Sequence, residues 1–178
     1  RKKAVDSLNL SEGDTVVEIA CGTGLNFPRL QQFVGPGGKI IGVDLTDNML
    51  AQAGRRVERN GWSNVELVQS DAGSYTFPHG IGGVISTFAL TLIPDYDQVI
   101  RKGAEALVPG KRLVILDLKL ASGAPLWLVK IGVFFSSPFG VTLEMAERHP
   151  WESVDGYLKD TSVEEMYFGF VYMAKGEA

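Results

Sequence analysis

The sequence is poor in cysteine and carries no excess of positive charge, and each shortage excludes a class of protein. Cys21 is the only cysteine among 178 residues, so no disulfide can form within the chain, and a reducing compartment is favoured. The net charge of −4 gives no electrostatic match to nucleic acid, and no dense run of Lys and Arg follows Arg1-Lys2-Lys3. We therefore expect a cytoplasmic protein that does not bind nucleic acid.

The sequence also lacks a long, uninterrupted hydrophobic run. Its longest apolar stretch, residues 124–141, contains Lys130, two prolines and two glycines, which makes a poor membrane-spanning helix. This composition is typical of an interfacial or lid segment, so we predict that any membrane contact is peripheral and made through 124–141. No apolar run of the signal-peptide type follows Lys3, and the missing initial methionine indicates a chain that begins inside a longer protein.

Short runs of β-branched and aliphatic residues alternate with helical patterns. Apolar residues at helical spacing indicate a helix over 49–57 and another over 99–107, the latter closing at Pro109-Gly110. The predicted strands cover residues 15–19, 39–43, 65–69, 83–86 and 111–118. Strands separated by helices favour a parallel sheet covered on both faces, so we predict an α/β fold in one domain over 1–178.

Two local patterns refine this interpretation. Asn26 is the expected N-cap of a helix that tolerates Pro28 in its first turn and stops near Gly35-Pro36-Gly37-Gly38. Near the end of the chain, the strand-like runs 162–167 and 168–174 follow one another directly. A junction this short requires an antiparallel hairpin, because a parallel crossover needs about a dozen residues or more.

Residues suited to ligand binding follow four of the predicted strands. They are Cys21-Gly22-Thr23-Gly24, Asp44, Ser70-Asp71 and Thr87-Phe88. In open α/β sheets, ligands bind at the carboxyl ends of the strands. Asp44 follows Gly22 by 22 residues, the spacing expected for an acid that binds ribose hydroxyls. We therefore predict a nucleotide site at this edge.

The pattern around the glycines separates the classes of nucleotide. A dinucleotide fingerprint G-x-G-x-x-G requires a small residue at position 27, where this chain has Phe27, and no Walker pattern is present. Glu18 precedes the loop, where its carboxylate can act on a cationic amino-acid group. A cofactor with an ammonium, a sulfonium and no phosphates fits such an acidic site better than a pyrophosphate does.

The segment Val17-Glu-Ile-Ala-Cys-Gly-Thr-Gly24 resembles motif I of the class I S-adenosylmethionine-dependent methyltransferases, hydrophobic-[D/E]-x-[G/A]-x-G-x-G. The later landmarks are Gly42-Val-Asp-Leu-Thr-Asp-Asn-Met-Leu50, Val68-Gln-Ser-Asp-Ala72, Ile93-Pro-Asp95 and Leu107-Val-Pro-Gly-Lys-Arg-Leu113. The chain is similar to the ubiquinone/menaquinone methyltransferases of the type 11 group and to phospholipid headgroup methyltransferases, which implies either a quinone-like acceptor or a lipid headgroup amine and leaves N-, O- and C-methylation open. This resemblance, over residues 4–118, implies a Rossmann-like doubly wound, mostly parallel seven-stranded sheet with an antiparallel C-terminal hairpin strand.

The resemblance also implies S-adenosyl-L-methionine as cofactor, and a set of residues that bind it. The loop would hold the methionyl part, Asp44 the ribose, Leu45 and Met49 the adenine face, Asp71 the adenine amino group with Ala72 beside the ring, and Thr87 and Phe88 the transferring methyl. The candidate cofactor residues are Glu18, Ala20, Cys21, Gly22, Thr23, Gly24, Asp44, Leu45, Met49, Ser70, Asp71, Ala72, Thr87 and Phe88. The chain departs from the pattern at Ala20, where many members have glycine.

The acceptor region is the variable segment, residues 119–160. The aromatic and aliphatic residues of 125–139 fit either a helix packed on the sheet or an apolar wall for a lipid-like or quinone-like acceptor. His149 is the candidate catalytic base, and no metal is expected. Two alternatives stay open: a non-catalytic nucleotide-binding module on the same scaffold, and an NAD-linked oxidoreductase, which Phe27 disfavours.

Overall fold

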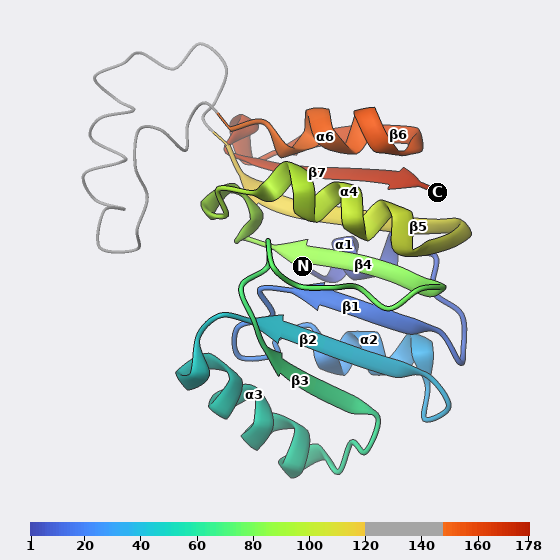
Figure 1. Cartoon of the computed structure of the whole chain (residues 1–178), viewed down its shortest axis with the longest axis vertical. Helices are drawn as coiled ribbons and strands as arrows, with labels where there is room; N and C mark the ends of the chain where they lie inside the picture. The colour runs from blue at the N-terminus through green and yellow to red at the C-terminus, as the bar shows by residue number, and fades with distance from the viewer. Residues whose placement is uncertain (120–147) are drawn as a thin grey trace.

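The computed structural model describes residues 1–119 and 148–178, which form a seven-stranded sheet with helices on both faces (Figure 1). The order across the sheet is β3-β2-β1-β4-β5-β7-β6. The strands from β3 to β5 run parallel to their neighbours, whereas β7 runs antiparallel to both β5 and β6. The predicted fold class is therefore confirmed. The strands are β1 (Thr15–Ile19), β2 (Lys39–Asp44), β3 (Val65–Gln69), β4 (Ile81–Thr87), β5 (Leu107–Leu118), β6 (Lys159–Met166) and β7 (Val171–Glu177).

The helices cover the two faces of the sheet and bury its apolar side chains. In Figure 1, α1 and α2 lie behind the sheet, and α4 lies in front of it with α6 beside it. One buried cluster joins β1, β2 and β4 to α4 and α6, and the other joins the sheet to α1 and α2. The described helical segments are α1 (Lys2–Asp6), α2 (Phe27–Val34), α3 (Asp47–Asn60), η1 (Leu90–Leu92), α4 (Tyr96–Ala106), α6 (Pro150–Tyr157) and η4 (Tyr167–Gly169).

Helix ends follow the turn chemistry of the sequence. Helix α2 has a proline in its first turn and ends at Gly35, which has a φ of 64°. Helix α3 ends at Gly61 in the left-handed conformation, with a φ of 66°. These conformations suit glycine, which has no Cβ to clash with the preceding turn.

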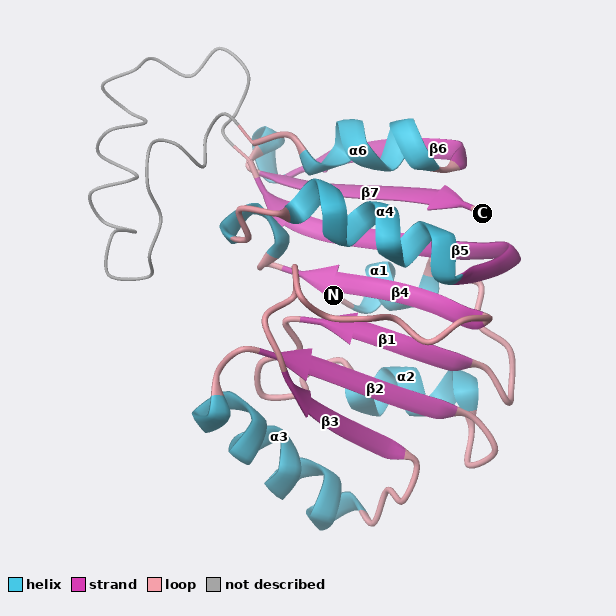
Figure 2. Cartoon of the chain, viewed as in Figure 1, coloured by secondary structure: helices cyan, strands magenta, loops and turns pink. Residues whose placement is uncertain are grey.

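The connection from β3 to β4, residues 70–80, contains no helix and crosses the front of the sheet as a loop (Figure 2). Tyr75 and Phe77 in this loop are buried, and their rings pack edge to face with centroids 5.0 Å apart. The two rings thus supply apolar cover that a crossover helix supplies elsewhere in this fold class.

Two boundaries were predicted wrongly. The strand expected over 168–174 is β7 (Val171–Glu177), because η4 (Tyr167–Gly169) takes up the first residues of that run. The helix expected to close at Pro109-Gly110 ends at Ala106, and β5 begins at Leu107. Leu107 already pairs with Ile81 of β4, and the register shifts before Arg112 pairs with Gly83. The proline and glycine therefore lie within an irregular strand, where a lost ladder bond is tolerated.

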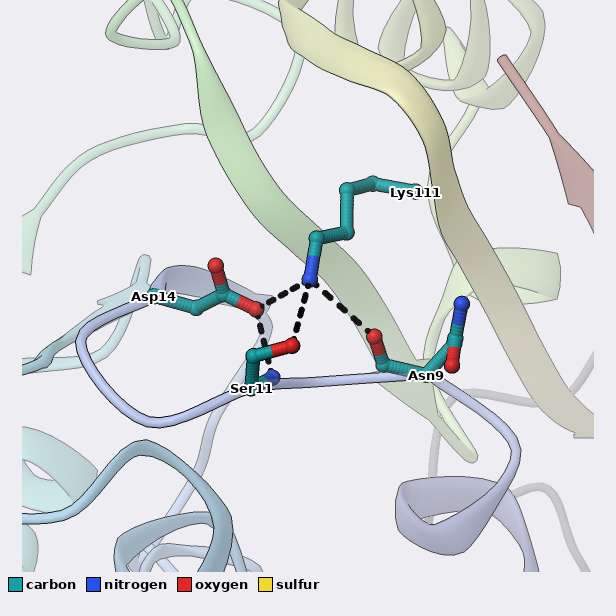
Figure 3. Close-up of polar contacts among 4 residues, drawn as sticks. All are labelled: Asn9, Ser11, Asp14 and Lys111. Carbon is teal, nitrogen blue, oxygen red and sulfur yellow. Dashed lines mark hydrogen bonds and ion pairs between the residues drawn. The ribbon is translucent and has the colours of Figure 1, made fainter.

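A polar cluster at the amino-terminal end of β1 ties the start of the chain to β5 (Figure 3). Lys111 donates to the Asp14 carboxylate at 2.6 Å, and to the backbone oxygen of Asn9 and the Ser11 hydroxyl at 3.2 Å each. Asp14 also accepts the Ser11 N–H at 2.7 Å. These hydrogen bonds link residues 9–14, which precede β1, to β5. The cluster lies at the edge of the sheet opposite the predicted site.

Candidate functional site

The carboxyl ends of β1, β2 and β4 meet at one edge of the sheet. Ile19 is in register with Val43 of β2 on one side and with Ser86 of β4 on the other. The residues that follow these three strands therefore lie side by side. Asp44 in turn pairs with Gln69 of β3, which brings Ser70 and Asp71 to the same edge. The structure thus brings together the segments predicted to bind the cofactor.

The loop after β1 folds back on itself through three left-handed residues. Ala20, Gly22 and Gly24 have φ values of 53°, 57° and 70°. Glycine adopts this conformation freely, whereas an alanine there is strained. The alanine that departs from the motif therefore occupies a position where the backbone favours glycine. A Cβ added to Gly22 would meet no protein atom within 4 Å, so the loop has room for a ligand to approach closely.

Phe27 fills the space that a dinucleotide fingerprint reserves for a small residue. Its ring is fully buried, and a Cβ added to Gly24 would lie 2.5 Å from it. A Cβ added to Gly42 of β2 would lie 2.7 Å from the same ring. Two glycines therefore make room for one aromatic ring under the loop, which accounts for the motif's departure from G-x-G-x-x-G.

Asp44 is almost buried and locks the glycine loop to β2. Its two carboxylate oxygens accept the backbone N–H groups of Gly22 at 2.8 Å and Thr46 at 2.9 Å. Each carboxylate oxygen has two acceptor sites, so both can still accept a hydroxyl. Beyond Asp44, the side chains of Leu45 and Met49 are 64% and 41% exposed, which leaves them able to contact a flat ring.

Glu18 is the most deeply buried acid of the edge. One of its oxygens, Oε1, accepts a hydrogen bond of 2.7 Å from Asn26, while Oε2 is buried without a partner. Burial raises the pKa of the Glu18 carboxyl to about 8, although the hydrogen bond from Asn26 acts in the opposite direction. A buried oxygen without a partner is costly, so this one is suited to a cationic donor from a ligand.

Asn26 has a role that the sequence interpretation missed. It stands at the N-cap position of α2, as predicted, but its side chain makes no capping bond. The amide instead donates to Glu18 and, at 3.1 Å, to the hydroxyl of Thr87. The predicted capping contact is therefore wrong, because a buried carboxylate competes for the same donor. Its place two residues after Gly24 is the signal that could have revealed this role.

Arg1 and Arg56 also reach this edge and were not predicted. The Arg1 guanidinium donates to the Thr87 hydroxyl and lies 5.1 Å from the centroid of the Phe88 ring. Phe88 itself has a φ of 60°, a strained value for an aromatic residue. Arg56 of α3 donates to the carbonyl of Thr23 at 2.9 Å. Positive charge therefore borders the acidic edge on two sides.

The predicted residues after β3 lie in a tight turn. The Ser70 N–H donates to the Asp44 carbonyl at 3.0 Å, and the Asp71 carboxylate accepts the N–H of Ser74 at 3.2 Å. Asp71 is exposed, whereas Ala72 is buried. Cys21 is buried as well, and burial raises the pKa of its thiol, so it has the character of a packed residue rather than a nucleophile.

His149 occupies the N-cap position of α6. Its ring stacks at 4.7 Å on Trp151, which in turn packs against Tyr172 at 4.9 Å. The His149 Nδ1 lies 3.1 Å from a carboxylate oxygen of Glu152, and the imidazole side chain is 43% exposed. This group borders the end of β5, because Lys119 lies 5.1 Å from the Trp151 ring centroid.

Several predictions fall on residues outside those described. The aromatic segment 125–139, the membrane contact through 124–141 and most of the acceptor region 119–160 lie within or across residues 120–147. Among the described residues, none of the helices is long and apolar enough to span a membrane. Within the same residues, no group of His, Cys, Asp and Glu side chains is arranged to hold a metal ion.

The sequence and the fold each match known proteins. The model of the ubiE/COQ5 methyltransferase family matches residues 1–127. The demethylmenaquinone methyltransferase of Listeria welshimeri is 31% identical over 118 residues, which are 66% of this chain and 50% of that protein. The chain therefore spans about half the length of the curated relatives it matches.

Two solved structures are similar to this chain in fold, and one of them contains the cofactor. A SAM-dependent methyltransferase from Aquifex aeolicus superposes with a TM-score of 0.68 at 21% identity, covering 98% of this chain and 87% of that one, and shows the shared fold. Phosphoethanolamine N-methyltransferase 2 of Haemonchus contortus, in complex with S-adenosyl-L-methionine, gives a TM-score of 0.74 at 26% identity over 92% of this chain and 37% of that one. The chain belongs to the ubiE/COQ5 methyltransferase family, and its cofactor is S-adenosylmethionine.

Proposed function

We propose that this chain catalyses methyl transfer from S-adenosylmethionine to a quinone-like acceptor. The observation that carries the proposal is the match to demethylmenaquinone methyltransferases over 118 residues, together with the family match over residues 1–127, which include the cofactor edge. The demethylmenaquinone in those names is a quinone that lacks a methyl group. The residues at the edge fit such an enzyme better than an oxidoreductase, because Phe27 occupies the position that the dinucleotide pattern reserves for a small residue.

The residues of the edge fit the parts of the cofactor. We propose that the partnerless Glu18 oxygen accepts a hydrogen bond from the ammonium group of the cofactor. Asp44 would accept hydrogen bonds from the ribose hydroxyls. In the same proposal, the exposed Leu45 and Met49 cover the adenine ring. Asp71 accepts a hydrogen bond from the adenine amino group, and Ala72 lies beside the adenine ring.

The cofactor supplies an activated methyl group on its sulfonium, so the chain's own task is alignment. A bound, aligned pair of reactants can lower the barrier by ~7–11 kcal/mol relative to free encounter. We propose that Thr87 and Phe88, at the end of β4, border the path between the two reactants. Thr87 is held by Asn26, and the strained backbone of Phe88 fixes the direction of its ring.

His149 is the proposed base for an acceptor that arrives protonated. A quinone-like ring in its reduced, hydroxylated form becomes a nucleophile when a hydroxyl loses its proton. It then takes the methyl group from the sulfonium, and S-adenosylhomocysteine leaves. One proton is released overall, from the hydroxyl if the oxygen is methylated and from the ring C–H if a ring carbon is. Glu152 beside the imidazole Nδ1 can orient the ring. We expect His149→Ala to lower turnover about 10²- to 10⁴-fold with the cofactor affinity unchanged. The control is His79→Ala, which changes an exposed loop histidine. Equal turnover in the two variants would contradict the proposal that His149 is the base.

The test of the proposed function offers two acceptors to the purified chain with methyl-labelled cofactor. Label in a reduced demethylated naphthoquinone supports the proposal. Label in phosphoethanolamine alone would contradict it and favour the second candidate, an amine methyltransferase, which the likeness to the Haemonchus contortus enzyme suggests. Asp44→Ala should weaken cofactor binding at least about tenfold through lost hydrogen bonds, whereas Asp47→Ala, at an exposed acid of α3, should not.

A further inference from the structure

The amino-acid end of the cofactor is a zwitterion with an ammonium and a carboxylate. The proposed role of Glu18 accounts only for the ammonium. A carboxylate buried at such an edge would need a cationic or N–H partner of its own. The described acids of the edge, Glu18, Asp44 and Asp71, would repel it. Arg1 and Arg56, the two arginines at this edge, are therefore the candidates for binding the carboxylate.

Arg1 is joined to Glu18 through a short chain of hydrogen bonds. Its guanidinium donates to Thr87 Oγ1, and Asn26 donates both to that same oxygen and to Glu18 Oε1. The positive and negative groups thus flank one hydroxyl. A guanidinium has five N–H donors in a planar fork, so the bond to Thr87 leaves donors for a carboxylate. Arg56 instead contacts the carbonyl of Thr23, on the side of α3.

The position of the guanidinium is also fixed by packing. It lies 5.1 Å from the centroid of the Phe88 ring, within the range of a cation–π contact. Thr87 is almost completely buried, so its hydroxyl is a fixed anchor for the guanidinium. A side chain held at two points loses less freedom when it binds a carboxylate.

We propose that Arg1 binds the carboxylate of the cofactor's methionyl group, as the counterpart of Glu18, which binds the ammonium. The two side chains, linked through Thr87 and Asn26, would thus bind the two charges of the zwitterion. The inference rests on the cofactor and on the proposed role of Glu18, and it is independent of which acceptor is methylated.

Three ligands separate these roles by calorimetric titration. S-adenosylhomocysteine carries both charged groups, its decarboxylated analogue keeps the amine alone, and 5′-methylthioadenosine has neither. We expect Arg1→Gln to weaken S-adenosylhomocysteine about 10- to 100-fold, as for a lost hydrogen bond to a charged group, and to leave the other two within about twofold. Glu18→Gln should weaken the first two ligands and spare the third. Arg1→Lys, which keeps the charge without the fork, should fall between wild type and Arg1→Gln.

Arg55→Gln, at an exposed arginine of α3, is the matched control, and all variants carry the same residue before position 1. Equal weakening of all three ligands by Arg1→Gln would overturn the inference, because Arg1 would then only support the edge. An Arg1→Gln variant that binds all three like wild type would overturn it too. A wild-type chain that binds S-adenosylhomocysteine but methylates neither acceptor would contradict the proposed function alone.

Discussion

At the scale of single residues, the protonation of Glu18 links the site to the stability of the chain. Burial raises the pKa of this carboxyl from 4.5 to about 8 in the folded protein. Between these two values the folded state holds a proton that the unfolded state has released. The stability from this group is therefore complete below about pH 4.5 and is lost as the pH rises through 8. The free protein should accordingly lose stability across this range.

A cation bound at Glu18 reverses the preference, because an ammonium favours the charged carboxylate. We therefore predict that cofactor binding at pH 7 releases up to about one proton per chain. Calorimetry in buffers of different ionisation enthalpy measures this number. Glu18→Gln should abolish the release, whereas Glu58→Gln, at an exposed acid of α3, should leave it unchanged. Binding by wild type without proton exchange would show that Glu18 does not meet the ammonium.

At the scale of elements, the loop between β1 and α2 depends on glycine for two separate reasons. Gly24 and Gly61 both have left-handed backbones, with φ values of 70° and 66°. A Cβ at Gly24 would also collide with the buried Phe27 ring at 2.5 Å, whereas a Cβ at Gly61 would meet nothing within 4 Å. The two positions therefore separate backbone strain from overpacking.

We predict that Gly61→Ala lowers the free energy of unfolding by about 1–2 kcal/mol, the strain of an alanine in the left-handed region. Gly24→Ala should cost a further ~1–3 kcal/mol, because the aromatic ring or the loop must move. Urea unfolding followed by circular dichroism measures both. Equal losses in the two variants would mean that Phe27 yields freely and does not set the shape of the loop.

At the scale of the whole molecule, the polar cluster of Figure 3 connects the segment before β1 to β5, and β4 separates these two strands in the sheet. The Lys111–Asp14 pair joins residues 97 positions apart, at 2.6 Å, with side chains only 18% and 19% exposed. Lys39 and Glu66 form a pair of the same length, with both side chains about half exposed. The two pairs differ in burial and in the further hydrogen bonds that Lys111 donates to Asn9 and Ser11.

We predict that Lys111→Met lowers the free energy of unfolding by about 1.5–3 kcal/mol, because it removes charge-assisted hydrogen bonds and leaves Asp14 without its cation. Lys39→Met should cost at most about 1 kcal/mol, as for an exposed ion pair. A double-mutant cycle with Asp14→Asn isolates the coupling. A coupling energy near zero would mean that the cluster does not stabilise the sheet.

The sequence alone determined the fold class, the order of the strands along the chain and the edge of the sheet at which the candidate site residues lie. Those features depend on local signals: β-branched runs, helical spacing, and glycines and acids at the ends of strands. The hairpin at the end of the chain was also predictable, because its short junction permits only antiparallel pairing. The start of β5 was predicted wrongly, because pairing with β4 overrides the turn signal of Pro109-Gly110.

Only the tertiary structure decided which polar groups meet. Asn26 was predicted to cap a helix, yet its amide lies between Glu18 and Thr87, which come from separate strands. Arg1 reaches Thr87 across 86 positions of sequence. Contacts of this kind leave no repeating pattern in the sequence, because they arise from the packing of a helix and two strands that are distant along the chain. The same packing buries Glu18 and shifts its pKa, a property that composition and spacing cannot express.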